Sequence, residues 1–233
     1  MNTTQTTEPI SPNATAEDAN ITTMQVRKRN GSLEPVDVNK IVRAVARCGT
    51  GLDNVDVLKI ATKTIGGLYD GATTKELDNL SIQTSALLIA EEPEYSRLAA
   101  RLLATSIMKE VENQDIHSFS QSIGAGVRHG LISEKVGQFV SANSRKLNDA
   151  IENQRNELFE YFGLRTVYDR YLLKNPETRE VIEAPQYFFM RVACGLAENV
   201  QEAVEFYNLI SRFEHMPSSP TLFNSGTKHP QMS

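Results

Sequence analysis

Three basic side chains near the start of the sequence are spaced so that they could bind an anion. Lys28 and Arg29 directly precede the turn dipeptide Asn30-Gly31, and Lys40 falls in the first turn of a helix that Asp37 can cap. The first turn of a helix exposes unpaired backbone N–H groups and the positive end of the helix dipole. Cations beside such a helix start favour a phosphate-rich ligand such as a triphosphate. The alternative is an ordinary solvated basic surface.

The first element that would position these cations is a β-hairpin over residues 24–36. Met24 and Val26 alternate with polar neighbours, and Leu33-Glu34-Pro35-Val36 supplies the returning strand. Asn30-Gly31 favours a type I′ turn between the strands. The hairpin would therefore carry Lys28 and Arg29 at its tip.

Four helices are predicted after the hairpin. Apolar residues at helical spacing predict helices over residues 38–49 and 55–69. Thr73, three residues before Glu76, forms a capping-box pattern that opens the third helix, and Pro93 suits the first turn of the fourth. The inner face of the fourth helix is expected to contain Tyr95, Leu98, Ala99, Leu102 and Ile107. The hairpin and these helices would form a small domain.

The second half of the chain is predicted to be mostly helical. Gly124, Gly126 and Gly130 interrupt any periodicity, so residues 110–135 are predicted to be a linker or a loosely helical stretch. Helical patterning resumes over residues 136–163, and further helices are expected over 187–197 and 203–213. Residues 216–223 are predicted to enter a β-strand that is followed by a loop.

Composition limits the class of protein. The chain has 233 residues and a net charge of −5, which disfavours sequence-independent binding to nucleic acid. The sequence contains neither a run of apolar residues as long as a membrane span nor a secretory signal. Cys48 and Cys194 are the only cysteines, which excludes a zinc ribbon and suits a cytoplasmic location. Both thiols are expected to be buried, and residues 1–23 are expected to be a disordered leader.

The order of motifs in the first half resembles the ATP-cone, a regulatory nucleotide-binding domain found at the N-terminus of many ribonucleotide reductases. The resemblance covers roughly residues 24–110 and combines a V-x-K-R-N-G hairpin with a matching order of four helices. The matching segments are Val26-Arg27-Lys28-Arg29-Asn30-Gly31, then Glu34, Val36, Asp37 and Lys40-Ile41, then Tyr69-Asp70-Gly71, Thr74 and Leu98-Ala99-Ala100-Arg101-Leu102.

The resemblance implies a site for ATP as activator or dATP as inhibitor, together with Mg²⁺. Lys28 and Arg29 would meet the phosphates, and the segment from Glu34 to Lys40 would wrap the nucleotide. Within that segment Glu34 would face the adenine amino group and Lys40 the phosphates, while Thr74 would add a hydroxyl and Lys109 would close the phosphate site. The residues that the resemblance assigns to the site are Lys28, Arg29, Glu34, Val36, Asp37, Asn39, Lys40, Thr74 and Lys109. For Thr74 an N-cap role is an equal alternative.

Two positions depart from the family pattern. Asp37 stands where the family often has Asn, and a carboxylate cannot donate a hydrogen bond to adenine N1, so Asp37 is expected to cap the helix. Asp78 stands where some members carry His near the sugar. The discrimination between ATP and dATP is therefore expected to differ.

The second half resembles the helical N-terminal region of the reductase large subunit and the start of its catalytic barrel. The first likeness is carried by residues 161–173 and 183–193, and the second by residues 219–227 with 230–233. In the family this last loop supplies a hydroxyl to the substrate phosphates, which assigns substrate binding to Ser219, with Thr221 the weaker candidate. The redox cysteine of the family would follow Ser233, so this segment is expected not to catalyse by itself.

The resemblance therefore implies a mainly α chain in which a β-hairpin caps a four-helix ATP-cone, followed by a helical domain and the first strand of a ten-stranded α/β barrel. The expected boundaries are 1–23 for the leader, 24–112 for the ATP-cone, 113–213 for the helical domain and 214–233 for the start of the barrel. The implied partners are the remainder of the large subunit, a radical-generating small subunit, further copies in a homo-oligomer, and thioredoxin or glutaredoxin. No nucleic acid, membrane, resident redox cofactor or metal site is expected.

The sequence leaves three other functions open. A stand-alone nucleotide-sensing regulator would carry a four-cysteine zinc ribbon before the cone, which this sequence lacks. An adenosylcobalamin-dependent reductase would need no radical-generating partner, and the segments that distinguish it are not in this chain. An interaction-only fragment would bind no nucleotide.

Overall fold

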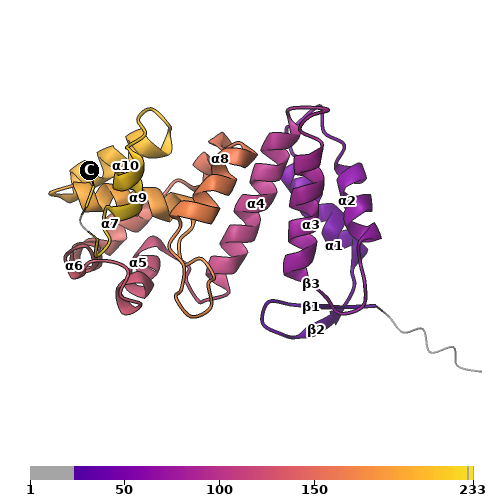
Figure 1. Cartoon of the computed structure of the whole chain (residues 1–233), viewed down its shortest axis with the longest axis horizontal. Coiled ribbons are helices and arrows are strands. Elements are labelled where there is room, and N and C mark those ends of the chain that lie inside the picture. The colour runs from indigo at the N-terminus through magenta and orange to yellow at the C-terminus, as the bar shows by residue number, and fades with distance from the viewer. Residues whose placement is uncertain (1–23, 230, 233) are drawn as a thin grey trace, which may run out of the picture.

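The structure is a computed structural model that describes residues 24–229, 231 and 232, so the predicted leader lies outside the described residues. The fold is mainly helical, with a small sheet beside the first helices (Figure 1). The prediction of a mainly α chain is thereby confirmed.

The first half contains a three-stranded sheet and four helices. Strand β1 pairs antiparallel with β2 and parallel with β3, so the strand order is β2-β1-β3. The third strand is absent from the sequence-based prediction, because two residues carry no periodic signal. The elements are β1 (Gln25–Arg27), β2 (Leu33–Pro35), α1 (Val38–Cys48), α2 (Val57–Gly66), β3 (Ala72–Thr73), α3 (Thr74–Leu87) and α4 (Tyr95–Glu112).

The turn between β1 and β2 differs from the predicted type I′ turn. Type I′ geometry needs a positive φ at both central residues. Gly31 has a φ of +84°, but Asn30 is not among the described residues with positive φ. The backbone N–H of Gly31 donates to the carbonyl of Lys28 at 2.9 Å, within a loop closed by Lys28 and Ser32. The prediction was wrong in turn type, but Lys28 and Arg29 do lie in the loop.

Side-chain caps fix where the helices of the first half begin. Asp37 accepts a hydrogen bond from the backbone N–H of Asn39 at 2.9 Å at the start of α1. At the start of α3, Thr73 and Glu76 form the predicted capping box, in which each side chain bonds to the other residue's backbone N–H. The N-cap of α3 is therefore Thr73, and the alternative N-cap role for Thr74 is wrong.

We expect Thr73→Ala to lower the free energy of unfolding by about 1 kcal/mol, because it removes the N-cap acceptor of α3. Urea unfolding monitored by circular dichroism would measure the change. Thr62→Ala is a matched control, since Thr62 is exposed within α2 and Ala is the better helix former. Equal stability of Thr73→Ala and the unsubstituted chain would contradict the assignment of the cap.

The second half is a set of shorter helices. They are α5 (Phe119–Arg128), α6 (Glu134–Ala142), α7 (Ser144–Asp149), the 3₁₀ helix η1 (Asn153–Leu158), α8 (Tyr161–Thr166), the π-helix η2 (Val167–Tyr171), α9 (Pro185–Leu196), α10 (Val200–Ser211) and α11 (Ser219–Asn224). Helices α9 and α10 match the predictions for this part of the chain to within a few residues. The single patterned stretch predicted over 136–163 is divided among α6, α7, η1 and α8.

Residues 110–135 were predicted to be a linker or a loosely helical stretch. The helical alternative is confirmed, since this segment contains the end of α4, all of α5 and the start of α6. Gly126 lies inside α5, where a Cβ atom would come 2.4 Å from Cδ1 of Ile132. The missing side chain lets the segment after α5 pack closely against the helix, and Gly130, with a φ of +71°, follows the end of the helix. Glycine here serves packing and helix termination.

The predicted strand over residues 216–223 was also wrong. The structure has α11 there, with Ser218 at the N-cap position and Pro220 in the first turn, a place that suits proline. Tyr171 stacks on Phe223, with 4.4 Å between ring centroids, and holds this helix against η2. No barrel strand is formed by these residues.

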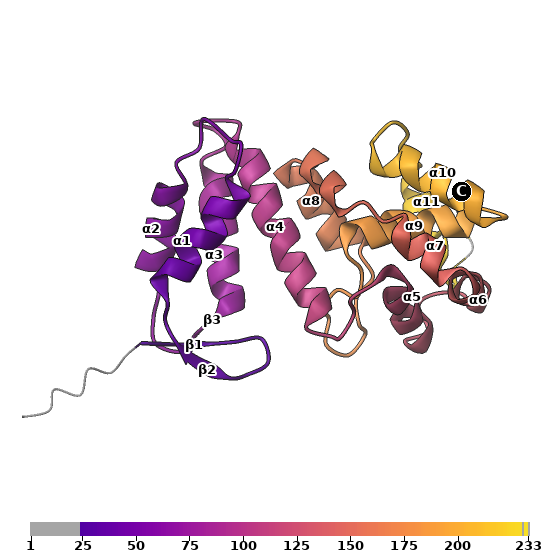
Figure 2. The ribbon, with the colours of Figure 1, turned by 180° about the vertical axis from the view of Figure 1, so that it is seen from behind.

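Helix α4 joins the two halves. It packs against α3 on one side and against α8 on the other, and Figures 1 and 2 show it between the two groups of helices. Its predicted inner face is confirmed, since Tyr95, Leu98, Ala99, Leu102 and Ile107 are buried. None of the helices in the described ranges has the length and apolarity needed to cross a membrane.

Candidate functional site

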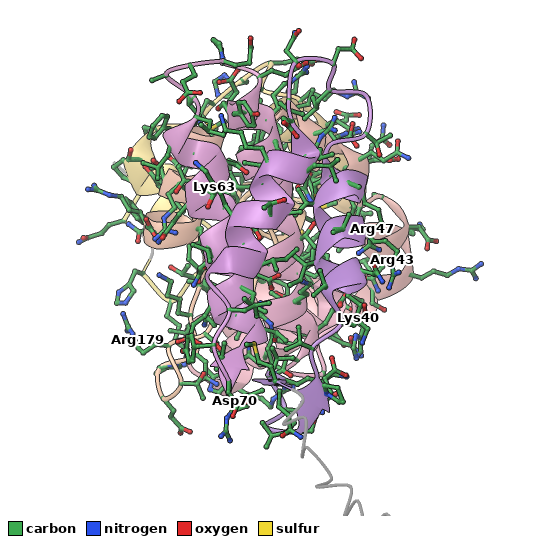
Figure 3. All side chains as sticks on the ribbon, turned by 90° about the vertical axis from the view of Figure 1, so that its right-hand side faces the viewer. Lys40, Arg43, Arg47, Lys63, Asp70 and Arg179 are labelled. Atoms are coloured by element: carbon green, nitrogen blue, oxygen red, sulfur yellow. The ribbon has the colours of Figure 1, made fainter. Side chains whose placement is uncertain are left out.

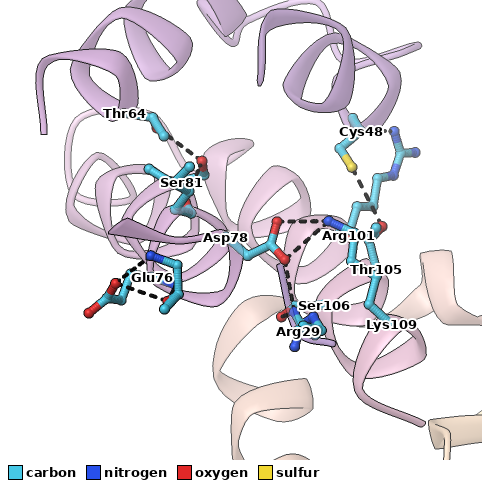
Figure 4. Close-up of polar contacts among 12 residues, drawn as sticks. Arg29, Cys48, Thr64, Glu76, Asp78, Ser81, Arg101, Thr105, Ser106 and Lys109 are labelled. Atoms are coloured by element: carbon cyan, nitrogen blue, oxygen red, sulfur yellow. Dashed lines mark hydrogen bonds and ion pairs between the residues drawn. The ribbon is translucent and has the colours of Figure 1, made fainter. Parts of the chain in front are cut away.

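Two carboxylates form ion pairs with the predicted cations of the first half. Glu34 pairs with Nζ of Lys28 at 2.7 Å and with Nζ of Lys40 at 3.4 Å. Asp78, on α3, pairs with Arg29 at 2.9 Å and with Lys109, on α4, at 2.8 Å. Figure 4 shows Asp78 joined by dashed lines to both Arg29 and Lys109. The hairpin loop, α1, α3 and α4 thus meet at one charged cluster.

Arg29 is the most buried cation of this cluster. Its side chain is 11% exposed, and Nη2 donates to Asp78 and to Oγ of Ser106 at 3.2 Å. Nη1 is buried, and within the described residues it has no hydrogen-bond partner. Leaving a buried guanidinium donor unpaired costs free energy. Arg29 therefore retains the capacity to donate to a further acceptor.

A cavity of about 140 Å³ lies beside the cluster, between α1, α2, α3 and α4. Its polar rim includes Lys40, Thr74, Asp78 and Lys109. Apolar side chains and small polar groups form the rest: Ile41, Ala44, Val45, Leu77, Leu102, Cys48, Thr64, Ser81 and Thr105. Ligand pockets commonly measure about 300–1,000 Å³. A ligand as large as a nucleotide would thus have to separate the ion pairs and extend from the cavity toward the surface.

The structure brings together only part of the predicted set. Lys40, Thr74 and Lys109 line the cavity, Arg29 joins them through Asp78, and Lys28 and Glu34 join through Lys40. Val36, Asp37 and Asn39 do not line it. Ser219 is exposed on α11, a helix in the other half of the molecule (Figure 2). Its Oγ lies 3.0 Å from the Tyr171 hydroxyl.

Asp37 is used within α1. Besides capping the helix, its carboxylate pairs with Arg43 at 3.3 Å. Lys40, Arg43 and Arg47 follow one another along the exposed side of α1 (Figure 3). Asp37 therefore has the capping role expected from the sequence.

The hydrogen bond from Lys28 lowers the pKa of Glu34 below its ordinary value, and Lys40 adds to the effect. A carboxyl group with a lowered pKa in the folded state stabilises the fold above its ordinary pKa, and the stabilisation is lost as the pH falls through the lowered value. We expect Glu34→Gln to lower the melting temperature at pH 7. The difference in melting temperature between the two proteins should disappear as the pH falls toward 3. Thermal unfolding of both proteins from pH 3 to 7 checks this, and a difference independent of pH would contradict it.

The cysteines are poor nucleophiles in this fold. Cys194 is buried, as predicted, and burial raises the pKa of its thiol to about 12. Cys48 is only half-buried, which corrects the prediction, but burial still raises the pKa of its thiol. Neither is a thiolate at neutral pH. Among the described residues, no group of three or more His, Cys, Asp or Glu side chains could hold a metal ion.

Sequence reasoning missed two parts of the site. Ser106, which accepts from Arg29, lies three residues before Lys109 and therefore on the same face of α4. That spacing was a usable signal once Lys109 had been assigned. The cavity floor, where Thr64 and Ser81 lie with their hydroxyl oxygens 2.9 Å apart, depends on the packing of α2 against α3 and has no local signal.

Comparisons with known proteins agree with the division of the chain into two halves. A family model described as the ATP cone domain matches residues 24–110. A second model, described as "Ribonucleotide reductase, all-alpha domain", matches residues 157–230.

Curated relatives match across both regions. The "Ribonucleoside-diphosphate reductase large chain 2" of Saccharomyces cerevisiae is 38% identical over 90% of this chain and 25% of its own length. The large subunits of Caenorhabditis elegans and vaccinia virus are 39% and 36% identical, over 89% and 90% of this chain and 27% and 28% of their own lengths. The chain thus spans about a quarter of the length of these relatives. The chain therefore contains an ATP cone domain and a ribonucleotide reductase all-alpha domain, and it is similar to the N-terminal region of ribonucleoside-diphosphate reductase large subunits.

Proposed function

We propose that the cluster around Arg29 and the adjoining cavity bind ATP or dATP as a regulatory nucleotide. The observation that carries the proposal is the buried Nη1 of Arg29, which lacks an acceptor among the described residues although Nη2 already has two. A phosphate oxygen supplies such an acceptor and forms a charge-assisted hydrogen bond.

The surrounding charges support a triphosphate. Lys28, Arg29, Lys40 and Lys109 carry four positive charges, and Glu34 and Asp78 offset two of them. A triphosphate brings three to four negative charges, so it can take these cations from their carboxylates. Mg²⁺ would accompany the phosphates, which commonly supply some of its ligands while water supplies others.

The other side chains are suited to the rest of the nucleotide. Glu34, once released by the lysines, accepts a hydrogen bond from the exocyclic amine of adenine. Val36 and Asn39 lie on the segment that wraps the nucleotide, and Thr74 offers its hydroxyl at the cavity rim. Asp78 is a cavity-lining carboxylate that faces the sugar, and it contributes to discrimination between ATP and dATP.

The complete protein would be a class I ribonucleoside-diphosphate reductase large subunit. It would convert ribonucleoside diphosphates to deoxyribonucleoside diphosphates in the cytoplasm, with a radical from a small subunit and electrons from thioredoxin or glutaredoxin. The names of the relatives support this activity. Ser219 would contact the substrate phosphates, ATP in the cone would permit activity, and dATP would repress it by favouring another oligomer.

The regulatory role can be tested on this chain by thermal unfolding in increasing ATP and, separately, dATP. A ligand that binds the folded state raises the melting temperature with concentration. We expect both nucleotides to do so, and Lys28→Ala and Lys40→Ala to reduce the shift. Lys59→Ala is a control, because Lys59 does not line the cavity and pairs with the exposed Glu91 in the turn between α3 and α4. Absence of any shift, or equal shifts in the two variants and the unsubstituted chain, would overturn the proposal.

A further inference from the structure

A buried carboxylate on α4 connects the two halves of the molecule. The Glu110 side chain is 3% exposed. Its Oε1 accepts from the backbone N–H of Val181 at 2.9 Å, and its Oε2 accepts from the Tyr168 hydroxyl at 3.1 Å. Its nearest cation is Lys75, on α3, with Nζ at 3.6 Å from Oε2. Glu110 therefore holds residues of the second half while its charge is balanced from the first.

The partners of Glu110 in the second half are firmly placed. Gln114 donates to the carbonyls of both Glu110 and Val181, at 3.0 and 2.8 Å. Arg165 and Lys174 lie over the Tyr168 ring, at 5.5 and 5.4 Å from its centroid. Burial and the neighbouring Glu110 charge raise the pKa of Tyr168 to about 12, so its hydroxyl remains a donor at neutral pH.

Lys75, the cation that pairs with Glu110, is adjacent to the charged cluster around Arg29 and Asp78. Lys75 follows Thr74 and lies three residues before Asp78, so the two side chains are neighbours on the surface of α3. Asp78 itself holds Arg29 and Lys109. Helices α3 and α4 are thus joined by two ion pairs of opposite polarity, Asp78 with Lys109 and Lys75 with Glu110.

We propose that nucleotide binding exchanges these ion pairs and thereby loosens the segment from Tyr168 to Val181. This inference rests on the proposed function. The phosphates take Arg29 and Lys109, and Asp78 is left without a cation. Lys75 is one turn away on the same helix, is 42% exposed and is free to turn, so it moves from Glu110 to Asp78.

When Lys75 moves to Asp78, Glu110 loses its cation. A buried carboxylate that loses its cation retains only the hydrogen bonds from Tyr168 and Val181, and an uncompensated buried charge destabilises its surroundings. The segment that donates these bonds opens more often, which lets water reach the carboxylate. Binding of the nucleotide phosphates at the cavity in this way changes how often a segment in the second half of the chain opens.

Hydrogen exchange followed by mass spectrometry tests the inference on the 233-residue chain. With saturating ATP, the peptide containing Val181 should exchange about threefold faster or more than without ATP. In the Lys75→Met variant, this peptide should exchange fast even without ATP, and adding ATP should not change its exchange rate further. Lys59→Met is the matched control, since Lys59 is 40% exposed and pairs with an exposed carboxylate at 3.4 Å. It should behave like the unsubstituted chain.

Calorimetric titration with ATP, run in parallel, distinguishes failure of the ion-pair exchange from failure of the proposed nucleotide binding. ATP binding without faster exchange at Val181, or slow exchange there in Lys75→Met, would overturn the ion-pair exchange and leave the nucleotide site intact. Absence of ATP binding would overturn the proposed function, and the exchange mechanism with it. Glu110→Gln adds a check, because a neutral amide should make exchange at Val181 insensitive to ATP.

Discussion

Replacing Arg29 with Ala should weaken ATP binding to the chain by about 100-fold. Each hydrogen bond to a charged group contributes about 1.5–3 kcal/mol, and a factor of ten in affinity corresponds to about 1.4 kcal/mol. Arg29 can offer Nη1, which has no partner among the described residues, and Nη2, which it shares with Asp78 and Ser106. Two such bonds to phosphate account for the expected loss, and calorimetric titration measures it.

Two further variants separate charge from geometry. Arg29→Lys keeps the charge but cannot form the two parallel bonds of a guanidinium, so we expect an intermediate loss. Arg27→Ala removes an exposed arginine from β1, two residues earlier, and should leave the affinity unchanged. An Arg29→Ala chain that folds and binds ATP as the unsubstituted chain does would refute the role of Arg29.

Replacing Arg191 with Met should destabilise the fold by about 3–5 kcal/mol, the usual effect of leaving a buried charge without its partner. Arg191 and Glu183 are both fully buried and 2.6 Å apart, and Arg191 also donates to the carbonyl of Ser225. Glu183 accepts in addition from the backbone N–H of Leu173. Urea unfolding of the chain measures the loss.

The exposed Arg212 provides the control for this prediction. It is 52% exposed and 4.0 Å from Glu214, so Arg212→Met should change stability by less than about 1 kcal/mol. The double variant Arg191→Met with Glu183→Gln should recover part of the loss, because the buried charge is then removed. A double variant no more stable than Arg191→Met alone would argue that the loss comes from packing.

Features set by neighbouring residues were the ones that the sequence predicted. The Asp37 cap, the Thr73–Glu76 capping box and the buried face of α4 each depend on residues within a few positions of one another. The turn type was wrong, and residues 110–135 could not be divided into linker and helix, because glycine permits several outcomes. Gly126 packs against Ile132, a contact that no local pattern encodes.

The candidate site divides in the same way. The cations could be located from the hairpin, from the helix start and from the family resemblance. Their pairing with Asp78 could not, because Arg29 and Asp78 are 49 positions apart and meet only when the hairpin loop lies against α3. A strand was predicted over residues 216–223 from the sequence and likened to the first strand of the family's barrel, but Ser219 lies in a short helix beside Tyr171.

A crystal structure of the chain with bound ATP would show which side chains contact the phosphates. We expect phosphate oxygens within hydrogen-bond distance of Arg29 and Lys109, with both side chains withdrawn from Asp78. A nucleotide bound elsewhere, for example in the groove lined by Arg47 and Arg101, would contradict it. So would a bound nucleotide that leaves the ion pairs of Asp78 unchanged.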